Sequence, residues 1–543
     1  MRVGSVVRVP LQGRRVRGWV LGLSDHAATE RRLLPIAKVS SDGPPADVMA
    51  LAEWAAWRWA GPVTRFLRSA SPPVAVRGAR GRGAEGRGAG SGFALEVVRV
   101  PPAGDPFGLA LDAAQEGDAL VLAPSLGEAS MVASRLRRAG HQVALMPREW
   151  ARAAAGGCVV VGARASAWAP VAALAAVVVI DEHDEVYQEE RAPTWNARDV
   201  VIERARRAGA RCVLASPCPS LEALALAGAA LRLASRADER AGWPALEVVD
   251  RREEAPGLGL YSERLVALLR EATPDERVVC VLNRKGRAVL IACVACRELA
   301  RCERCDGPLE SGGDRAGNGA SVARMKCRRC GGEQPPVCRW CGAGKFKALR
   351  IGVARVREEL ELLAGQAVAE VTAETAVGAL PTAPVLVGTS AVLHRAARAR
   401  VVAFLDFDQE LLAPRYRAGE EALALLARAG RVVGGRDGRV LVQTRVPGHE
   451  VLEAALHADP SRLAVVEEAR RAALRLPPET ALARVSGPGA SAFVEQLRDV
   501  DLMGPAGDRW LVRAPDHATL CDALAAVVRP SARVRVEVDP LRA

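Results

Sequence analysis

Four Cys-x2-Cys pairs within residues 293–341 constrain the fold of this chain more than any other feature. Each pair can form a turn that presents two thiolates to one tetrahedral cation, and two pairs complete a four-cysteine site. Eight cysteines therefore predict two zinc ions with no open coordination position, which is typical of structural rather than hydrolytic zinc. The pairs are Cys293 with Cys296, Cys302 with Cys305, Cys327 with Cys330, and Cys338 with Cys341.

The spacing alone leaves the pairing of these four turns open. A sequential arrangement would combine the first two pairs and then the last two, whereas a nested arrangement would combine the outer pairs and the inner pairs. An iron–sulfur cluster is the main alternative to zinc, but paired Cys-x2-Cys turns favour single-metal sites. Disulfides are disfavoured because the N-terminus lacks the apolar core of a signal peptide, which predicts a reducing, cytoplasmic location.

Short apolar runs that alternate with helical stretches predict an α/β fold with parallel sheets. One series lies within residues 93–235, and a second lies within residues 236–450, where the cysteine-rich segment 291–344 interrupts it. We therefore expect two tandem α/β lobes, the second with a zinc-binding insertion. Residues 1–76 show strand-like alternation and then a helix, residues 77–92 form an Arg/Gly linker, and residues 451–543 begin helical and end strand-like. The longest apolar run, residues 165–180, is shorter than the ~20 residues that a bilayer requires.

Basic residues concentrate in two segments of a chain whose formal net charge is +12. Residues 1–93 and residues 284–350 each hold 15 basic and six acidic residues, so each segment carries +9 and the remainder carries −6. Two basic segments predict a polyanion that meets the protein at two places, although solvated arginines from a GC-rich genome are the alternative. Two loaded zinc sites would lower the second +9 to about +5. The candidate DNA contacts are Arg14, Arg15, Arg17, Arg328 and Arg329.

Tandem α/β lobes with basic segments suggest a nucleic-acid motor, but the sequence lacks the phosphate-binding loop of such a motor. That loop, G-x4-G-K-[ST], binds the ATP phosphates through its lysine and Mg²⁺ through its hydroxyl. Of the five lysines only Lys345 follows a glycine; it lacks a following Ser or Thr, and Arg339 stands where the first glycine belongs. The pair Asp181-Glu182 after an apolar strand is an arrangement that holds Mg²⁺ in motors, and we interpret it here as a relic.

Short stretches in chain order resemble the family of replication restart proteins PriA, also called primosomal protein N-prime, which are bacterial superfamily 2 helicases. They are residues 4–20 (GSVVRVPLQGRRVRGWV), 180–199 (IDEHDEVYQEERAPTWNARD), 219–222 (PSLE), 282–286 (LNRKG), 387–389 (VGT), 405–406 (LD), 411–414 (LLAP), 502–505 (LMGP) and 538–540 (VDP). The resemblance implies a β-rich N-terminal domain, 1–76, that binds the 3′ end of a nascent DNA strand. It also implies two RecA-like helicase lobes, 93–235 and 236–450, and an α+β C-terminal domain, 451–543.

The resemblance also implies nested pairing of the cysteines. One zinc ion would be held by Cys293, Cys296, Cys338 and Cys341, and the other by Cys302, Cys305, Cys327 and Cys330. The family binds abandoned forks and helps to reload the replicative helicase within a primosome. The implied partners are therefore forked and single-stranded DNA, primosome proteins and the replicative helicase.

The sequence departs from the family pattern at the ATP site. The phosphate loop is missing, Ser216-Pro217-Cys218 stands where Ser-Ala-Thr is expected, and residues 428–434 replace a box rich in Gln and paired Arg. The linker at 77–92 stands where the family has a winged-helix domain. We therefore expect a degenerate helicase fold that binds forks without a catalytic site, in the cytoplasm with the nucleoid. A residual ATP-dependent 3′–5′ DNA helicase and a zinc-ribbon RNA-binding protein are the alternatives.

Overall fold

The structure is a computed structural model that describes residues 1–24, 34–78, 92–227, 230–252, 260–282, 291–311, 324–327, 330–348, 353–372, 375, 381–396 and 398–542. The chain forms two compact units. The first unit comprises Met1–Val100, Asp105–Leu233 and Arg471–Ala543, and the second comprises Pro101–Gly104 and Ala234–Arg470.

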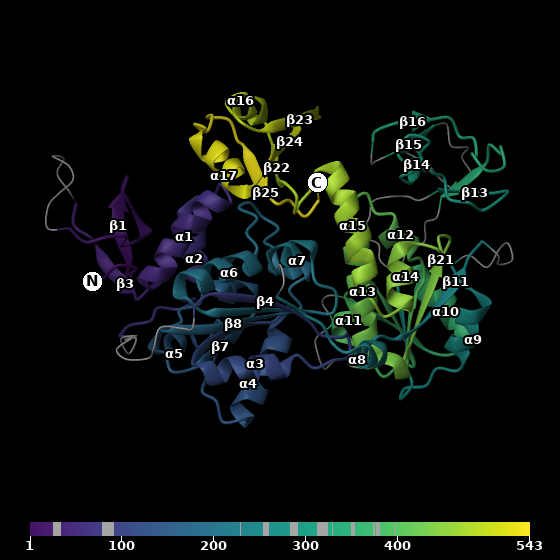
Figure 1. Cartoon of the computed structure of the whole chain (residues 1–543), viewed down its shortest axis with the longest axis horizontal. Coiled ribbons are helices and arrows are strands. Elements are labelled where there is room, and N and C mark those ends of the chain that lie inside the picture. Colours follow the sequence, from purple (N-terminus) through teal and green to yellow (C-terminus); the bar gives the residue numbers. More distant parts are fainter. Residues whose placement is uncertain are drawn as a thin grey trace. The chain divides into compact units, whose positions relative to one another are not determined.

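A hairpin and two helices form the N-terminal part of the first unit (Figure 1). Strands β1 (Val6–Leu11) and β2 (Arg14–Trp19) pair antiparallel, and β3 (Lys38–Ser41) pairs with the other edge of β1. Gln12 and Gly13 join β1 to β2 with φ of 47° and 75°, the left-handed conformation that a two-residue hairpin turn requires. Helices α1 (Ala46–Arg58) and α2 (Val63–Ala70) follow.

A parallel sheet of seven strands, in the order β10-β4-β9-β8-β5-β7-β6, forms the centre of the first unit. Its middle strands are buried on both faces, so their sequences are continuous apolar runs rather than alternating ones. The strands are β4 (Ala94–Arg99), β5 (Asp118–Leu122), β6 (Val143–Leu145), β7 (Val159–Gly162), β8 (Leu174–Ile180), β9 (Arg211–Ser216) and β10 (Leu231–Arg232).

Helices cover both faces of this sheet. Helices α3 (Phe107–Glu116) and α4 (Leu126–Arg138) pack on one face. The other face packs in a single apolar core with α5 (Trp150–Ala155), α6 (Ala197–Ala208), α1 and α2. Ser125 caps the start of α4 by accepting a hydrogen bond from the Glu128 N–H, and Gly209 ends α6 in the left-handed conformation. The short elements η1 (Arg164–Trp168), η2 (Glu185–Tyr187) and α7 (Leu221–Ala227) connect the strands.

The C-terminal part of the first unit is a four-stranded antiparallel sheet with two helices. Its strand order is β23-β24-β22-β25, and its apolar side chains join the same core as α1 and α2. The elements are β22 (Ala481–Ser486), α16 (Ala490–Val494), β23 (Asp501–Ala506), β24 (Arg509–Ala514), α17 (His517–Ala526) and β25 (Arg535–Val538).

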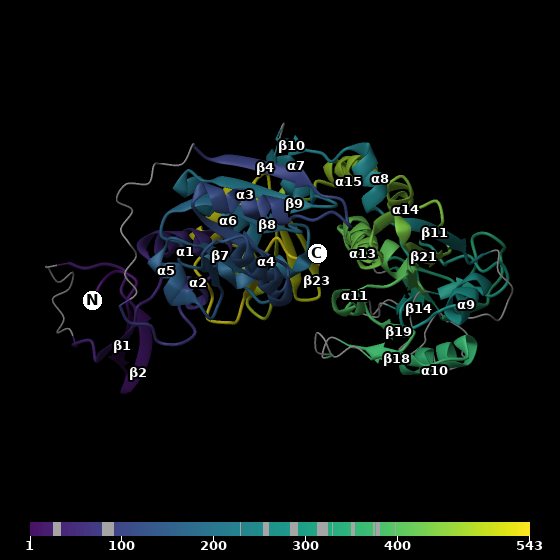
Figure 2. The ribbon, with the colours of Figure 1, turned by 90° about the horizontal axis from the view of Figure 1, so that it is seen from below.

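The second unit contains a parallel sheet of six strands in the order β11-β21-β20-β12-β19-β18. Figure 2 shows α9 and α10 on one side of this sheet and α11 and α13 on the other. The strands are β11 (Ala245–Asp250), β12 (Val278–Val281), β18 (Val368–Val371), β19 (Val385–Gly388), β20 (Val401–Phe404) and β21 (Arg439–Thr444). The helices are α8 (Arg236–Gly242), α9 (Glu263–Arg270), α10 (Val353–Ala364), α11 (Val392–Arg395), α12 (Asp408–Leu411), α13 (Ala418–Val433), η3 (Gly435–Asp437), α14 (Glu450–Leu456) and α15 (Ser461–Leu474).

The cysteine-rich insertion follows β12 and has two small sheets of its own. Strands β13 (Ile291–Cys293) and β17 (Phe346–Ala348) pair, and β14 (Leu309–Ser311), β15 (Met325–Cys327) and β16 (Glu333–Gln334) form the second sheet. Its core holds Ile291, Leu309 and Met325 together with two of the cysteines. The predicted α/β class with parallel sheets and a cysteine-rich insertion is confirmed.

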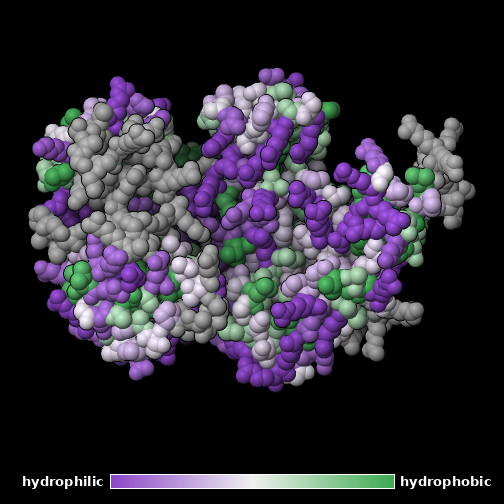
Figure 3. Space-filling view, turned by 180° about the vertical axis from the view of Figure 1, so that it is seen from behind, coloured by the Kyte–Doolittle hydropathy of each residue, from purple (hydrophilic) through white to green (hydrophobic). Residues whose placement is uncertain are grey.

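Hydrophilic residues dominate the face of the molecule seen in Figure 3, where apolar residues form only small separate groups. Within the described part of the chain, every helix is too short or too polar to cross a bilayer.

Candidate metal centres and nucleic-acid surface

The four Cys-x2-Cys pairs fold into one repeated turn. In each turn the N–H four residues after the first cysteine donates to that cysteine's carbonyl, at 2.8–3.0 Å. The first cysteine's N–H donates in turn to the carbonyl five residues on, at 2.8–2.9 Å. The residue after the second cysteine has a left-handed φ of 54–72° in every copy, and these residues are Arg297, Asp306, Gly331 and Gly342. Two of them are glycine, the residue that adopts this conformation without strain.

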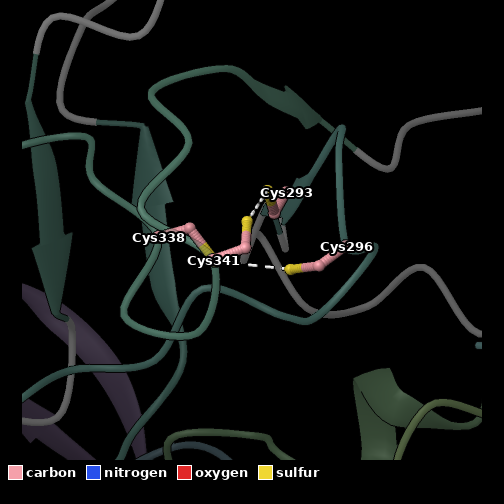
Figure 4. A group of neighbouring side chains, drawn as sticks. All are labelled: Cys293, Cys296, Cys338 and Cys341. Carbon is pink, nitrogen blue, oxygen red and sulfur yellow. Dashed lines mark hydrogen bonds between the residues drawn. The ribbon is translucent and has the colours of Figure 1, made fainter.

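The turns bring the eight thiols together as two groups of four. Cys293, Cys296, Cys338 and Cys341 form the first group, in which the side chains point toward one another (Figure 4). Cys302, Cys305, Cys327 and Cys330 form the second. In each group all four sulfurs lie within 4.8 Å of one another. This grouping is the nested one that the family resemblance implies.

The sulfur separations suit a tetrahedral metal ion. The Sγ atoms of Cys293 and Cys341 lie 3.6 Å apart, and those of Cys302 and Cys330 are also 3.6 Å apart. A zinc ion with Zn–S bonds of ~2.3 Å separates its tetrahedral sulfurs by ~3.8 Å. Both groups could therefore hold a metal ion with four protein ligands, which leaves no coordination position for water.

The turn lowers the pKa of one thiol in each group, whereas burial and then hydrogen bonds with neighbouring thiols raise the pKa of Cys296 and of Cys305 to about 12. Burial raises the pKa of Cys293, but hydrogen bonds from the backbone N–H groups of Cys296 and then Ala295 outweigh it and lower the pKa to about 7. A backbone hydrogen bond from Gly332 similarly lowers the pKa of Cys330 to about 7. Metal affinity should fall as pH drops below this range, because protons compete for the sulfurs.

The arginines near these groups differ in their surroundings. Arg301 and Arg339 both pair with Asp306, at 2.7 and 2.8 Å. Arg304 has no acidic partner among the described residues and is exposed. The candidate contacts Arg328 and Arg329 lie outside the described residues.

The hairpin arginines form a surface of positive charge. Arg14, Arg15 and Arg17 are all exposed on β2. Arg15 and Arg17 share one face of the strand, and Arg14 lies on the other. Arg8 of β1 stands directly opposite Arg17, a neighbour that the sequence analysis missed, although a two-residue turn at Gln12-Gly13 fixes this register.

Arg17 lies near two other positive charges, Arg8 and Arg68. Partial burial and then repulsion from Arg8 and Arg68 lower the pKa of Arg17. Within the described ranges none of these three guanidinium groups has an acidic partner. A phosphate group placed among them would relieve this repulsion. Arg68 lies on α2, and only the folded structure brings it near Arg17.

The loop between β4 and α3 stands where a phosphate loop belongs. The loop connects β4, the first strand of the lobe, to helix α3. In the sheet, β9 lies between β4 and β8, and Asp181 and Glu182 directly follow β8. Phosphate loops bind their ligand through free backbone N–H groups. In residues 100–106 (VPPAGDP) three positions are proline and have no N–H. The N–H groups of Val100, Ala103 and Gly104 donate to protein carbonyls at 2.8–3.1 Å.

A carboxylate occupies the start of α3. Asp105 accepts a hydrogen bond from the Phe107 N–H at 3.0 Å. It also accepts two from Arg135, at 2.9 and 2.5 Å. The hydrogen bond from Arg135 lowers the pKa of Asp105, so the carboxylate is charged at neutral pH. A negative side chain thus stands at the helix N-terminus that would otherwise attract a phosphate.

In the acidic pair after β8, the Glu182 carboxylate makes hydrogen bonds and an ion pair within the protein. Glu182 is buried, and its carboxylate accepts hydrogen bonds from the Ser220 N–H at 2.8 Å and the Ser220 hydroxyl at 2.9 Å. Arg198 completes the group through an ion pair with Glu182 at 3.3 Å. Asp181 is buried with a left-handed φ of 53°. The sequence analysis identified the pair but not Arg198 and Ser220, its structural partners.

Comparisons with known proteins point to one family. A family model described as a 3′ DNA-binding domain of PriA matches residues 1–72, which include β1, β2, α1 and α2. The replication restart protein PriA of Bacillus subtilis is 28% identical over 68% of this chain, and that of Treponema pallidum is 31% identical over 60%. The PriA of Thermotoga maritima is 25% identical over 74% of the chain. The chain is similar to replication restart proteins PriA.

The matches cover only part of the PriA relatives. The aligned region is 49% of the Bacillus protein, 51% of the Treponema protein and 58% of the Thermotoga protein, so the chain spans about half the length of the PriA proteins it matches. Arg8, Arg17 and Arg68 all lie within the matched DNA-binding domain. The positive surface is therefore a candidate DNA contact of this chain.

Replacing Arg17 by alanine should weaken DNA binding to a similar degree for every sequence, because a phosphate contact carries no sequence information. The slope of log K against log salt should fall by about one. Fluorescence anisotropy with labelled forks at several salt concentrations measures both. Arg138→Ala, which removes an exposed arginine of α4 outside the matched domain, serves as the control. Equal salt slopes for Arg17→Ala and wild type would contradict the assignment.

Proposed function

We propose that this protein binds abandoned or stalled replication forks and helps to reload the replicative helicase as part of the primosome, without ATP-driven unwinding. Its partners would be forked and single-stranded DNA, primosome proteins and the replicative helicase. The match to the 3′ DNA-binding domain of PriA supports the DNA-binding part, and so do Arg8, Arg17 and Arg68, which have no acidic partner among the described residues.

The observation that carries the proposal is the loop between β4 and α3. A motor would need free N–H groups, a lysine and a hydroxyl there. This chain has three prolines, internally bonded N–H groups and a charged Asp105 instead. Glu182, which would orient water in a motor, is bonded to Ser220 and Arg198. These features support reading Asp181 and Glu182 as a relic of an ancestral ATP site.

Zinc is the metal we propose for both cysteine groups, with two ions per chain. Four thiolates that can surround one ion tetrahedrally are ligands that structural zinc prefers, and they leave no coordination position open for water or substrate. The metal would hold the insertion folded, and the helicase-like lobes would serve as a scaffold. We keep the predicted domain limits, 1–76, 93–235, 236–450 and 451–543, as part of this proposal.

A binding assay with three substrates tests the fork-binding part. At one stated salt concentration, the protein should bind a fork with a free nascent 3′ end more tightly than a blunt duplex of equal length. It should also bind that fork more tightly than structured RNA of equal charge. Equal affinity for all three would show that only non-specific charge attraction operates and would contradict the proposal.

A further inference from the structure

Three exposed apolar residues gather at the first cysteine group. Trp340 lies between the ligands Cys338 and Cys341 and is 58% exposed, whereas other tryptophans of the chain, such as Trp59, are fully buried. Val294, in the turn that begins at Cys293, is 56% exposed, and Val337 is 49% exposed. Exposed valines are ordinary, but an exposed tryptophan in a turn fixed by the cysteine group is a candidate binding surface.

The cysteine group brings together the two turns next to which these residues lie. The Sγ atoms of Cys293 and Cys341 are 3.6 Å apart, and Val294 and Trp340 are their immediate neighbours in the chain. Figure 4 shows the two turns meeting at these sulfurs. We call Val294, Val337 and Trp340 the Trp340 patch. Because metal binding would lock both turns, the patch would be rigid, which lowers the entropy lost when a ligand binds.

Two cationic residues, Arg339 and Lys345, lie near the Trp340 patch, and Arg339 also pairs with Asp306. The Arg339 guanidinium lies 4.8 Å from the centre of the Trp340 ring. The Val294 N–H donates to the Lys345 carbonyl at 2.9 Å, so Lys345 is next to the patch. Lys345 has no acidic partner in the described part of the chain. Residues 293–296 and 338–345 contain no Asp or Glu.

An aromatic ring with flanking cations suits an unpaired nucleobase. Bases of single-stranded nucleic acid stack on exposed aromatic rings, and Lys or Arg beside the ring meets the adjoining phosphates. An apolar protein segment would use the three apolar residues but would leave Lys345 without a partner, whereas Arg339 already pairs with Asp306. A tetrathiolate zinc site would carry a formal −2 beside the patch, and stacking on a neutral ring tolerates that charge better than a purely ionic contact does.

We propose that Trp340 is a stacking platform for an unpaired base in the single-stranded part of fork DNA, with Lys345 beside the flanking phosphate. The inference rests on the proposed function, because it assigns this surface to the fork. It adds a second DNA contact, on the metal-binding insertion, to the one within residues 1–72.

Replacing Trp340 by alanine tests the stacking contact. Binding to single-stranded oligonucleotides and to forks with a single-stranded arm should weaken roughly 5- to 100-fold, the range found when one stacked aromatic residue is removed. The fold-loss should be the same at low and high salt, because stacking releases no counterions. Binding to blunt duplex should not change, and Trp340→Phe should retain most of the affinity. Leu362→Ala, which removes an 85% exposed leucine of α10, is the matched control.

Photo-crosslinking of the wild-type protein avoids any effect of the substitution on the fold. Single-stranded DNA that carries iodouracil should label Trp340, as located by mass spectrometry. Labelling that omits Trp340 would overturn the inference, and so would an affinity of Trp340→Ala for single-stranded arms equal to that of wild type. If the wild-type protein still binds forks, either result leaves the proposed function standing. If the wild-type protein binds no fork, the proposed function fails and this inference fails with it.

Discussion

The double variant Cys302→Ser and Cys330→Ser should release one of two metal ions per chain and unfold the middle of the insertion. Both cysteines belong to the second group, which would lose half of its ligands. Four-ligand zinc sites contribute about 10–16 kcal/mol at pH 7 in zinc-finger peptides. The core around Ile291, Leu309 and Met325 is too small to replace that contribution. Metal content by mass spectrometry and limited proteolysis of the insertion measure the two effects.

A second double variant makes this test specific for the grouping. Cys293→Ser with Cys302→Ser removes one ligand from each nested group, so it should disturb both ions, whereas Cys302→Ser with Cys330→Ser should spare one. Sequential pairing predicts the reverse, because it places Cys293 with Cys302 and separates Cys302 from Cys330. Fork binding should weaken in both variants. A reversed order of metal loss would show that the nested grouping is wrong.

Replacing Asp539 by asparagine should destabilise the first unit by about 3–5 kcal/mol, the cost of removing one partner from a buried ion pair. Asp539 pairs with Arg58 at 2.7 Å and with His517 at 2.9 Å. Its backbone carbonyl accepts a hydrogen bond from Gln188 at 2.6 Å. Arg58 is buried, and among the described residues Asp199, at 3.8 Å, would be its one remaining acidic partner. Asparagine suits the left-handed φ of 51° at this position, so the cost reports lost charge rather than backbone strain.

Urea denaturation at several pH values measures this cost and its pH dependence. Burial would raise the pKa of Asp539, but His517 and Arg58 outweigh it and hold the pKa well below the ordinary value. A lowered carboxylate pKa stabilises the fold above the unfolded value of ~3.9, and the contribution is lost as pH falls below it. The difference between wild type and Asp539→Asn should therefore persist at neutral pH and shrink below pH ~4. Asp501→Ala, which removes an exposed carboxylate that pairs with Arg475 and Arg513, should cost less than ~1 kcal/mol.

The strands that the sequence predicted best are those buried on both faces. β5, β8 and β12 are continuous apolar runs because both faces of a parallel sheet are covered. β11 has no fully buried residue and contains Glu247 and Asp250, so it has no such run. The C-terminal strands β22, β23 and β24 were missed for a related reason. They form an antiparallel sheet, and Arg, Gly or Pro interrupts the short apolar stretches of their sequences, ALARVS, DLMGPA and RWLVRA.

The features of the candidate sites that depend on local sequence were predictable, above all the metal-binding turns. Cys-x2-Cys spacing specifies the metal-binding turns, and Gly331 and Gly342 mark two of their left-handed positions. Contacts between distant segments left no such signal: Arg68 beside Arg17, and Arg198 with Ser220 around Glu182. Asp105 before Pro106 at the start of a helix was a signal available in the sequence, because Asp caps helices and Pro is favoured in the first turn.

The most direct test of the account measures fork binding and ATP turnover in the same preparation. We predict tight binding to forks, no phosphate release that forks stimulate, and no separation of the fork strands when ATP and Mg²⁺ are added. Phosphate release that rises with fork concentration and accompanies strand separation would contradict the account.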